Sequence, residues 1–273
     1  MKKLLLQSSV FLLLLGLMST SHSQGNENRY IPVFCNQGHS IQDAVDRATE
    51  GATIEVFGTC REAVLVDKDR LKFFGLGELT TIIPPCCAPA FQIIADSVQI
   101  ESFTITGAVT GIAITRGSQA NIVDNVISDS GAFGILVKDN SQANLVQNQV
   151  VNSGVSGIWI SGSSQATFSG NTTTGNTQFG VGVVEGASAV FAHNIITGNG
   201  SHGISVQTNG VVNLLNTNKI SGNGDFGVSC EETAVLVVNK AQNFDGGNGL
   251  GNVEVVLGPP SCFVKNPSGV PFP

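Results

Sequence analysis

The chain has 273 residues, and its 13 basic and 20 acidic side chains give a formal net charge of −7 at pH 7. This length suits one sizeable domain, and the acidic balance argues against nucleic acids and anionic membranes as partners. Charged residues make up only 12% of the chain, against roughly a quarter in average domains. Gly, Asn, Ser, Thr and Val take their place, a composition that suits stacked strands joined by tight turns.

The N-terminus has the pattern of a secretory signal peptide. Lys2 and Lys3 precede an apolar run over residues 4–18, and Ser21-His22-Ser23 offers small residues for cleavage. We therefore expect residues 1–23 to be removed on export, which makes the protein secreted or periplasmic. The run is short for a membrane span, so an uncleaved anchor is the less favoured alternative, and no later segment predicts a span. Removing the two lysines leaves 13 − 2 = 11 basic against 20 acidic residues, a balance of −9.

Six cysteines in an exported chain favour disulfides. We predict a Cys35–Cys60 bond, because the two residues bracket the first helix and strand, and a Cys230–Cys262 bond that ties down the C-terminal segment. A bond between the adjacent Cys86 and Cys87 would be strained, so these two are either free or paired elsewhere. No pair has the C-x-x-C spacing of a zinc site, and no metal site is predicted.

The first elements in chain order are a short strand and a helix. Residues 24–30 are polar and expected to be disordered, and residues 31–34 can form a strand. Ser40 begins a capping-box-like pattern, and Gly51 is the expected stop. The apolar positions between them have helical spacing: Ile41, Ala44, Val45 and Ala48. We expect this helix to cap the open end of a stack of strands formed by the rest of the chain.

From residue 52 to residue 105, apolar residues alternate in short bursts separated by Gly and Pro, which predicts strands. A repeat then becomes explicit, with steps of 23, 23, 23, 23 and 24 residues between its Gly-Ile or Gly-Val pairs; the glycines are Gly111, Gly134, Gly157, Gly180, Gly203 and Gly227. A fixed period of this length indicates a solenoid. Three short strands per repeat predict a three-sided coil.

An asparagine follows the same period, at Asn125, Asn148, Asn171, Asn194, Asn218 and Asn239. It falls where the second strand of each repeat bends into the third, and we expect the amides to bond from coil to coil in a ladder. Counting back three residues from each asparagine predicts one inward column: Ile122, Leu145, Phe168, Phe191, Leu215 and Leu236. Counting back five gives a second: Ala120, Ala143, Ala166, Ala189, Asn213 and Ala234.

The predicted fold is therefore all-β: a single-stranded right-handed parallel β-helix over residues 31–257, with coils of about 23 residues and a short N-terminal capping helix. Residues 258–273 form a Pro-rich tail. The segments Ser40-Ile41-Gln42-Asp43-Ala44-Val45, Gly51-Ala52-Thr53-Ile54-Glu55-Val56 and Gly58-Thr59-Cys60-Arg61-Glu62, with the Gly-Ile and Asn-x-Ile repeats, resemble the pectin-lyase-like superfamily. The resemblance covers about residues 31–256. It implies one of the functions found in that superfamily, whose members include polysaccharide lyases, polygalacturonases, epimerases, phage tailspikes and surface proteins. The resemblance does not indicate which of these functions applies.

Catalytic residues of those relatives are hard to place on this sequence. Ser201-His202-Gly203-Ile204-Ser205-Val206 resembles a polygalacturonase segment, but the other motifs of that family are missing. His202 falls in a column with Phe133, Ser156, Phe179 and Phe226, so a ring stacked among phenylalanines is the favoured interpretation. Calcium is possible, but no cluster of acidic ligands supports it, and no cofactor is predicted.

The outward face after each glycine is the remaining candidate. Arg116 and Asp139 fall in neighbouring coils, and Asp139 and Glu185 would lie about 10 Å apart, near the upper end for an inverting carboxylate pair. Trp159, the only tryptophan, is expected to lie exposed between them. The predicted binding residues are therefore Trp159, Lys138, Arg116 and Glu231, and the catalytic candidates are Asp139, Glu185 and His202.

The favoured function is carbohydrate binding on an outward strand face, with a polysaccharide or glycan surface as the partner. A polysaccharide lyase, glycoside hydrolase or epimerase is the first alternative, and a purely structural surface protein is the second. The missing acid–base cluster favours binding over catalysis.

Overall fold

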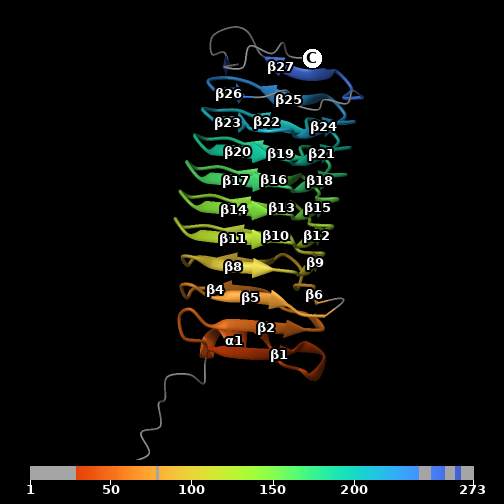
Figure 1. The fold of residues 1–273 in the computed structure, drawn as a ribbon. Helices are drawn as coiled ribbons and strands as arrows, with labels where there is room; N and C mark the ends of the chain where they lie inside the picture. Colours follow the sequence, from red (N-terminus) through yellow and green to blue (C-terminus); the bar gives the residue numbers. More distant parts are fainter. Residues whose placement is uncertain (1–28, 78–79, 240–246, 256–261, 266–273) are drawn as a thin grey trace, which may run out of the picture.

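The computed structural model describes residues 29–77, 80–239, 247–255 and 262–265. The strands of three parallel sheets stack coil upon coil along one axis, and α1 lies at the N-terminal end of the stack beside β1 and β2 (Figure 1). The predicted signal peptide and most of the predicted Pro-rich tail lie outside the described residues. No helix in the described ranges is long and apolar enough to cross a membrane.

Sheet A contains 11 strands in coil order: β1 (Tyr30–Phe34), β2 (Thr53–Phe57), β5 (Lys72–Gly75), β8 (Val98–Glu101), β11 (Gln119–Val123), β14 (Gln142–Val146), β17 (Gln165–Ser169), β20 (Ser188–Ala192), β23 (Val211–Leu214), β26 (Val235–Val238) and β28 (Phe263–Lys265). Its first strand begins at Tyr30, inside the segment expected to be disordered. Its last strand lies beyond residue 257, so coil stacking continues into the predicted tail.

Sheet B contains 8 strands: β3 (Thr59–Cys60), β6 (Thr81–Ile82), β9 (Thr104–Thr106), β12 (Val126–Ser128), β15 (Gln149–Val151), β18 (Thr172–Thr174), β21 (Ile195–Thr197) and β24 (Lys219–Ser221). Sheet C contains 9: β4 (Val64–Val66), β7 (Pro89–Ile93), β10 (Thr110–Ile114), β13 (Phe133–Val137), β16 (Ser156–Ile160), β19 (Val181–Val183), β22 (Ile204–Val206), β25 (Phe226–Cys230) and β27 (Gly251–Val255). From β2 to β25 each coil contributes one strand to each sheet, as the repeat predicts. The additional strands of sheets A and C, namely β1, β26, β27 and β28, lie at the two ends of the described stack.

The core is the inside of the coil, where alternate residues of all three sheets meet. Both predicted columns need correction in their last two coils. Leu214, not Leu215, follows Phe191, and Val238, not Leu236, comes next. In the other column Val212, not Asn213, follows Ala189, and Leu236, not Ala234, comes next. The extra residue of this coil lies between Leu214 and Asn218, so counting back from the asparagine slips by one and reverses the two faces of the strand.

The capping helix α1 (Ile41–Arg47) follows a 3-10 turn, η1 (Cys35–Gln37). Ser40 is its N-cap and accepts the backbone N–H of Asp43, as predicted. The helix ends at Arg47 rather than continuing to Gly51, because Ala48 already has extended backbone angles. The ammonium of Lys68 donates to the carbonyls of Val45, Asp46 and Ala48 at the end of the helix. The last carbonyls of a helix have no hydrogen-bond donor within the helix, and Lys68 supplies one.

The predicted asparagine ladder is present from Asn125 to Asn218. From Asn148 onward each side-chain oxygen accepts both the backbone N–H and the side-chain amide of the asparagine one coil earlier, as between Asn148 and Asn171 at 2.9 and 3.0 Å. The oxygen of Asn125 accepts the backbone N–H of Phe103. Asn239 is not in register with it. The backbone N–H of Asn239 bonds to Leu214, which places it one residue past β26, and its side chain donates to Asn213.

A second ladder was not predicted. Asn176, Asn199, Asn223 and Asn248 bond in the same way at the bend from sheet B to sheet C, with amide-to-oxygen distances of 2.8 to 2.9 Å. Their spacing of 23, 24 and 25 residues is visible in the sequence. Asn199 is buried in this ladder, so its side chain has a structural role.

Candidate functional site

Two disulfides fix the ends of the coil stack, and both were predicted. Cys35 bonds to Cys60 at the N-terminal end, and Cys230 bonds to Cys262 at the C-terminal end. Cys86 and Cys87 are free and exposed.

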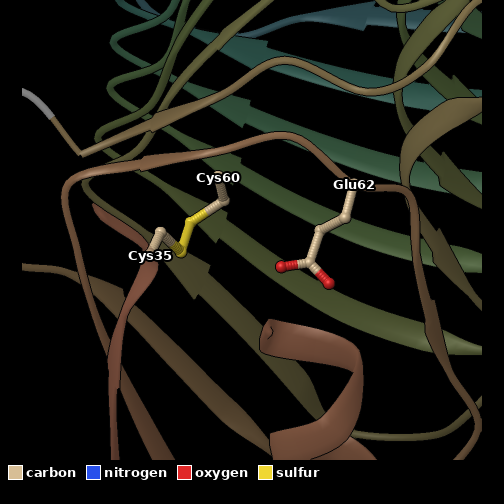
Figure 2. A group of neighbouring side chains, drawn as sticks. All are labelled: Cys35, Cys60 and Glu62. Atoms are coloured by element: carbon tan, nitrogen blue, oxygen red, sulfur yellow. A yellow bond between two sulfur atoms is a disulfide. The ribbon is translucent and has the colours of Figure 1, made fainter. Parts of the chain in front are cut away.

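Glu62 lies beside the first disulfide and makes the one group of three potential metal-binding side chains among the described residues. Figure 2 shows Cys35 and Cys60 joined through their sulfur atoms, with the Glu62 carboxylate beside the short helix. Its oxygens accept the Ser40 hydroxyl and the backbone N–H of Ile41, both at 2.7 Å. Since the sulfurs are bonded to each other and the carboxylate caps α1, these side chains already have structural partners.

The three catalytic candidates do not converge. Asp139 and Glu185 lie two coils apart in the turn after sheet C, with Gly162 between them. The Asp139 carboxylate lies 3.7 Å from the ammonium of Lys138, and both side chains are exposed. His202 lies at the other end of the sheet C strands. Glu185 neighbours Thr208 in the next coil. Thr208 is six residues from His202, which corresponds to roughly 20 Å of extended chain.

The binding candidates are spread along the stack. Lys138 and Glu231 occupy equivalent positions four coils apart, which is roughly 19 Å at one strand spacing per coil. Arg116 is exposed in the turn next to Asp139, as predicted. Glu231 accepts the hydroxyl of Ser229 in its own coil, at 2.8 Å.

Trp159 is half-buried rather than exposed, because its ring is part of an aromatic stack. The indole lies between Phe133 and Phe179, with ring centroids 5.6 and 6.3 Å away and planes inclined by 30° and 20°. His202 continues the stack between Phe179 and Phe226, at 5.4 and 5.8 Å, as the column predicted. Both faces of the Trp159 ring therefore meet other rings, and only its edge is left for a ligand.

A groove on sheet A is the site that the sequence patterns did not reveal. It crosses β11, β14, β17 and β20 along the stack and has a volume of about 300 Å³. Its lining is uncharged throughout: Ser97, Gln119, Ala120, Asn121, Gln142, Ala143, Asn144, Gln165, Ala166, Thr167, Ser188 and Val190. We call this surface the amide groove.

The amide groove repeats with the coil. Gln119, Gln142 and Gln165 form one column in register, and Asn121, Asn144 and Thr167 form the next. Thr167 donates to Asn144 at 2.8 Å, so neighbouring coils hold each other's polar side chains in place. The glutamines are 23 residues apart in the sequence, a signal that could have identified the groove.

The turn residues predicted for the sheet C face do not line this groove. Arg116, Asp139 and Glu185 lie three residues before Gln119, Gln142 and Ser188 in the sequence, but none of the three is among the lining residues. A second pocket, of about 610 Å³, lies against α1 and is lined by both signs of charge, including Asp43, Asp46 and Arg47. The amide groove differs from that pocket in being uncharged and in following the coil repeat.

The family described as "Right handed beta helix region" matches residues 91–254, more than half of the chain. No curated protein sequence matches. Among solved structures, alginate lyase from Paenibacillus sp. str. FPU-7 has a TM-score of 0.59 and 14% identity, over 83% of this chain and 99% of the lyase.

Two viral proteins are also similar to this chain. ORF18 of Geobacillus virus E2 has a TM-score of 0.59 and 12% identity, over 82% of this chain but only 59% of the viral chain. The active domain of tailspike protein 2 from bacteriophage CBA120 has a TM-score of 0.56 and 12% identity, over 83% of this chain and 43% of the tailspike. At these identities the likeness shows the fold alone.

Proposed function

Because this chain belongs to the right-handed β-helix family, we propose that it is an exported protein that binds a neutral polysaccharide along the amide groove of sheet A. The family match and the three parallel sheets confirm the predicted fold of the pectin-lyase-like superfamily. That fold is shared by proteins of many functions, so the proposal rests on the groove.

The single observation that carries the proposal is the uncharged, repeating lining of the groove. Side-chain amides both donate and accept hydrogen bonds, as sugar hydroxyls do. Successive coils are about 4.8 Å apart, so a chain of repeated hydroxylated units along the axis meets the same pair of polar columns in the three coils of β11, β14 and β17.

Charge favours a neutral polymer over a polyuronate. No charged side chain lines the groove, and the whole chain carries a formal net charge of −7. A polyanion would therefore meet repulsion without a cationic partner in the groove. Binding is favoured over cleavage because Asp139, Glu185 and His202 do not converge on one site.

Retention on a panel of immobilised polysaccharides, neutral and uronate, with and without calcium, tests the proposal. We expect retention on a neutral polymer that changes little with salt, since uncharged hydrogen bonds are not screened. Product sizing and absorbance of unsaturated uronates are measured on the same mixtures and are expected to stay unchanged. Shortened products would instead support a lyase or hydrolase, and no retention on any polymer would support a purely structural role.

A further inference from the structure

Cys86 and Cys87 occupy an exposed loop whose two ends are held in the coil. The loop joins β6 to β7, and within it Pro84 and Pro85 directly precede the two cysteines. At its start the backbone N–H of Ile83 bonds to Cys60, and at its end the carbonyl of Ala88 accepts from Val109. Both thiols are exposed to solvent.

The two sulfur atoms lie side by side, 2.7 Å apart. Neighbouring side chains point to opposite faces of an extended chain, so this contact needs a turn. Cys87 provides it with a φ of 70°, in the left-handed region that few residues other than glycine adopt. The backbone thus presents both thiols on one side of the loop.

The other four cysteines are all disulfide-bonded, as expected of a protein from an oxidising compartment. From these observations we propose that Cys86 and Cys87 are a redox-modification site, which closes to a vicinal disulfide on reaction with small disulfides and reopens with thiols. This inference is independent of the proposed glycan binding.

The reaction balances as a thiol–disulfide exchange. The thiolate of one cysteine attacks a small disulfide R–S–S–R, which forms a mixed disulfide and releases one RS⁻. The second cysteine then attacks the mixed disulfide, forms the Cys86–Cys87 bond and releases the second RS⁻. The two cysteines lose two electrons, the small disulfide gains them, and the two thiol protons end on the two RSH molecules.

The contact between the thiols also affects the ionisation of Cys87. The hydrogen bond with Cys86 raises the pKa of the Cys87 thiol above its ordinary value, so less of Cys87 is thiolate at a given pH than for an ordinary cysteine. The same disulfide forms whichever of the two cysteines attacks first.

The product is expected to be reversible. Adjacent Cα atoms are about 3.8 Å apart across a trans peptide, below the roughly 4.4–6.8 Å usual for disulfides. A bond between neighbours therefore stores strain, and strained, exposed disulfides are the labile ones. The bonds Cys35–Cys60 and Cys230–Cys262 are between residues far apart in sequence and escape this constraint.

The test uses the full purified chain in glutathione buffers of increasing oxidised fraction, followed by acid quenching, alkylation with N-ethylmaleimide and intact mass measurement. We expect the wild type to change from two alkyl labels to none as the oxidised fraction rises, with the structural disulfides unlabelled throughout. Peptide mapping should place the lost labels at Cys86 and Cys87.

Cys86→Ser and Cys87→Ser are the matched controls. Each keeps one thiol with no partner, so each is expected to accumulate one stable glutathione adduct where the wild type carries none. Circular dichroism checks that both variants are folded. Two labels in the wild type at every ratio, or a stable adduct like that of the single variants, would overturn the proposal.

Discussion

The indole of Trp159 lies directly over Gly182, the residue in register with it one coil further on. A methyl group on Gly182 would overlap the six-membered part of the ring. The glycine therefore makes room for Trp159 to extend between Phe133 and Phe179. In the coil of Trp159 the aromatic column has the small, buried Ser156 instead of a ring, and the indole lies in that gap.

Gly182→Ala should displace the indole and lower the free energy of unfolding by about 1–3 kcal/mol, as overpacking does. Because Trp159 is the only tryptophan, its fluorescence reports the displacement, and chemical denaturation gives the energy. In a Trp159→Ala background the same substitution should cost less than about 0.5 kcal/mol. An equal cost in both backgrounds would refute the contact.

Asn171→Ala should lower the free energy of unfolding by roughly 1–3 kcal/mol. The amide of Asn171 is buried and donates to both Leu145 and Asn194, so its removal leaves ladder groups without partners. Gln149→Ala, an exposed amide on sheet B, is the control and should change stability by less than about 0.5 kcal/mol. Equal effects of the two substitutions would argue against an energetic role for the ladder.

Glu62→Ala should loosen the capping helix before the rest of the coil. The substitution removes the acceptor for Ser40 and for the backbone N–H groups of Ile41 and Gln42, at a cost of about 1–3 kcal/mol. Hydrogen exchange at Ile41 and Gln42 should accelerate, while exchange in the central sheet A strands stays slow. Asp67→Ala removes an exposed acid near the same end and should leave these rates unchanged.

Much of the fold could be predicted because the information is local and repeated. One turn-forming asparagine per coil and alternating apolar residues define the strands, the core and the first ladder. The error at Leu215 arose because a coil of 24 residues does not reveal where its extra residue lies. The partners of α1, Glu62 and Lys68, could not be predicted, since they depend on how the helix packs against the second coil.

The site was harder to predict for two physical reasons. A tryptophan on an outward strand position looks exposed in the sequence, but its long side chain reaches rings in both neighbouring coils. The columns of Gln142 and Asn144 look like an ordinary solvated strand face, and only the packed coils show that they line a groove. The regular spacing of these amides was the available signal.

Isothermal titration with the neutral polysaccharide retained in the panel tests the amide groove most directly, by comparing two variants. Gln142→Ala combined with Asn144→Ala removes polar groups from the centre of the groove, and Trp159→Ala changes the sheet C face instead. Loss of two or more hydrogen bonds should weaken binding about tenfold or more, whereas Trp159→Ala should leave the affinity within about twofold. Unchanged binding in the double variant together with loss in Trp159→Ala would contradict the account and place the ligand on sheet C.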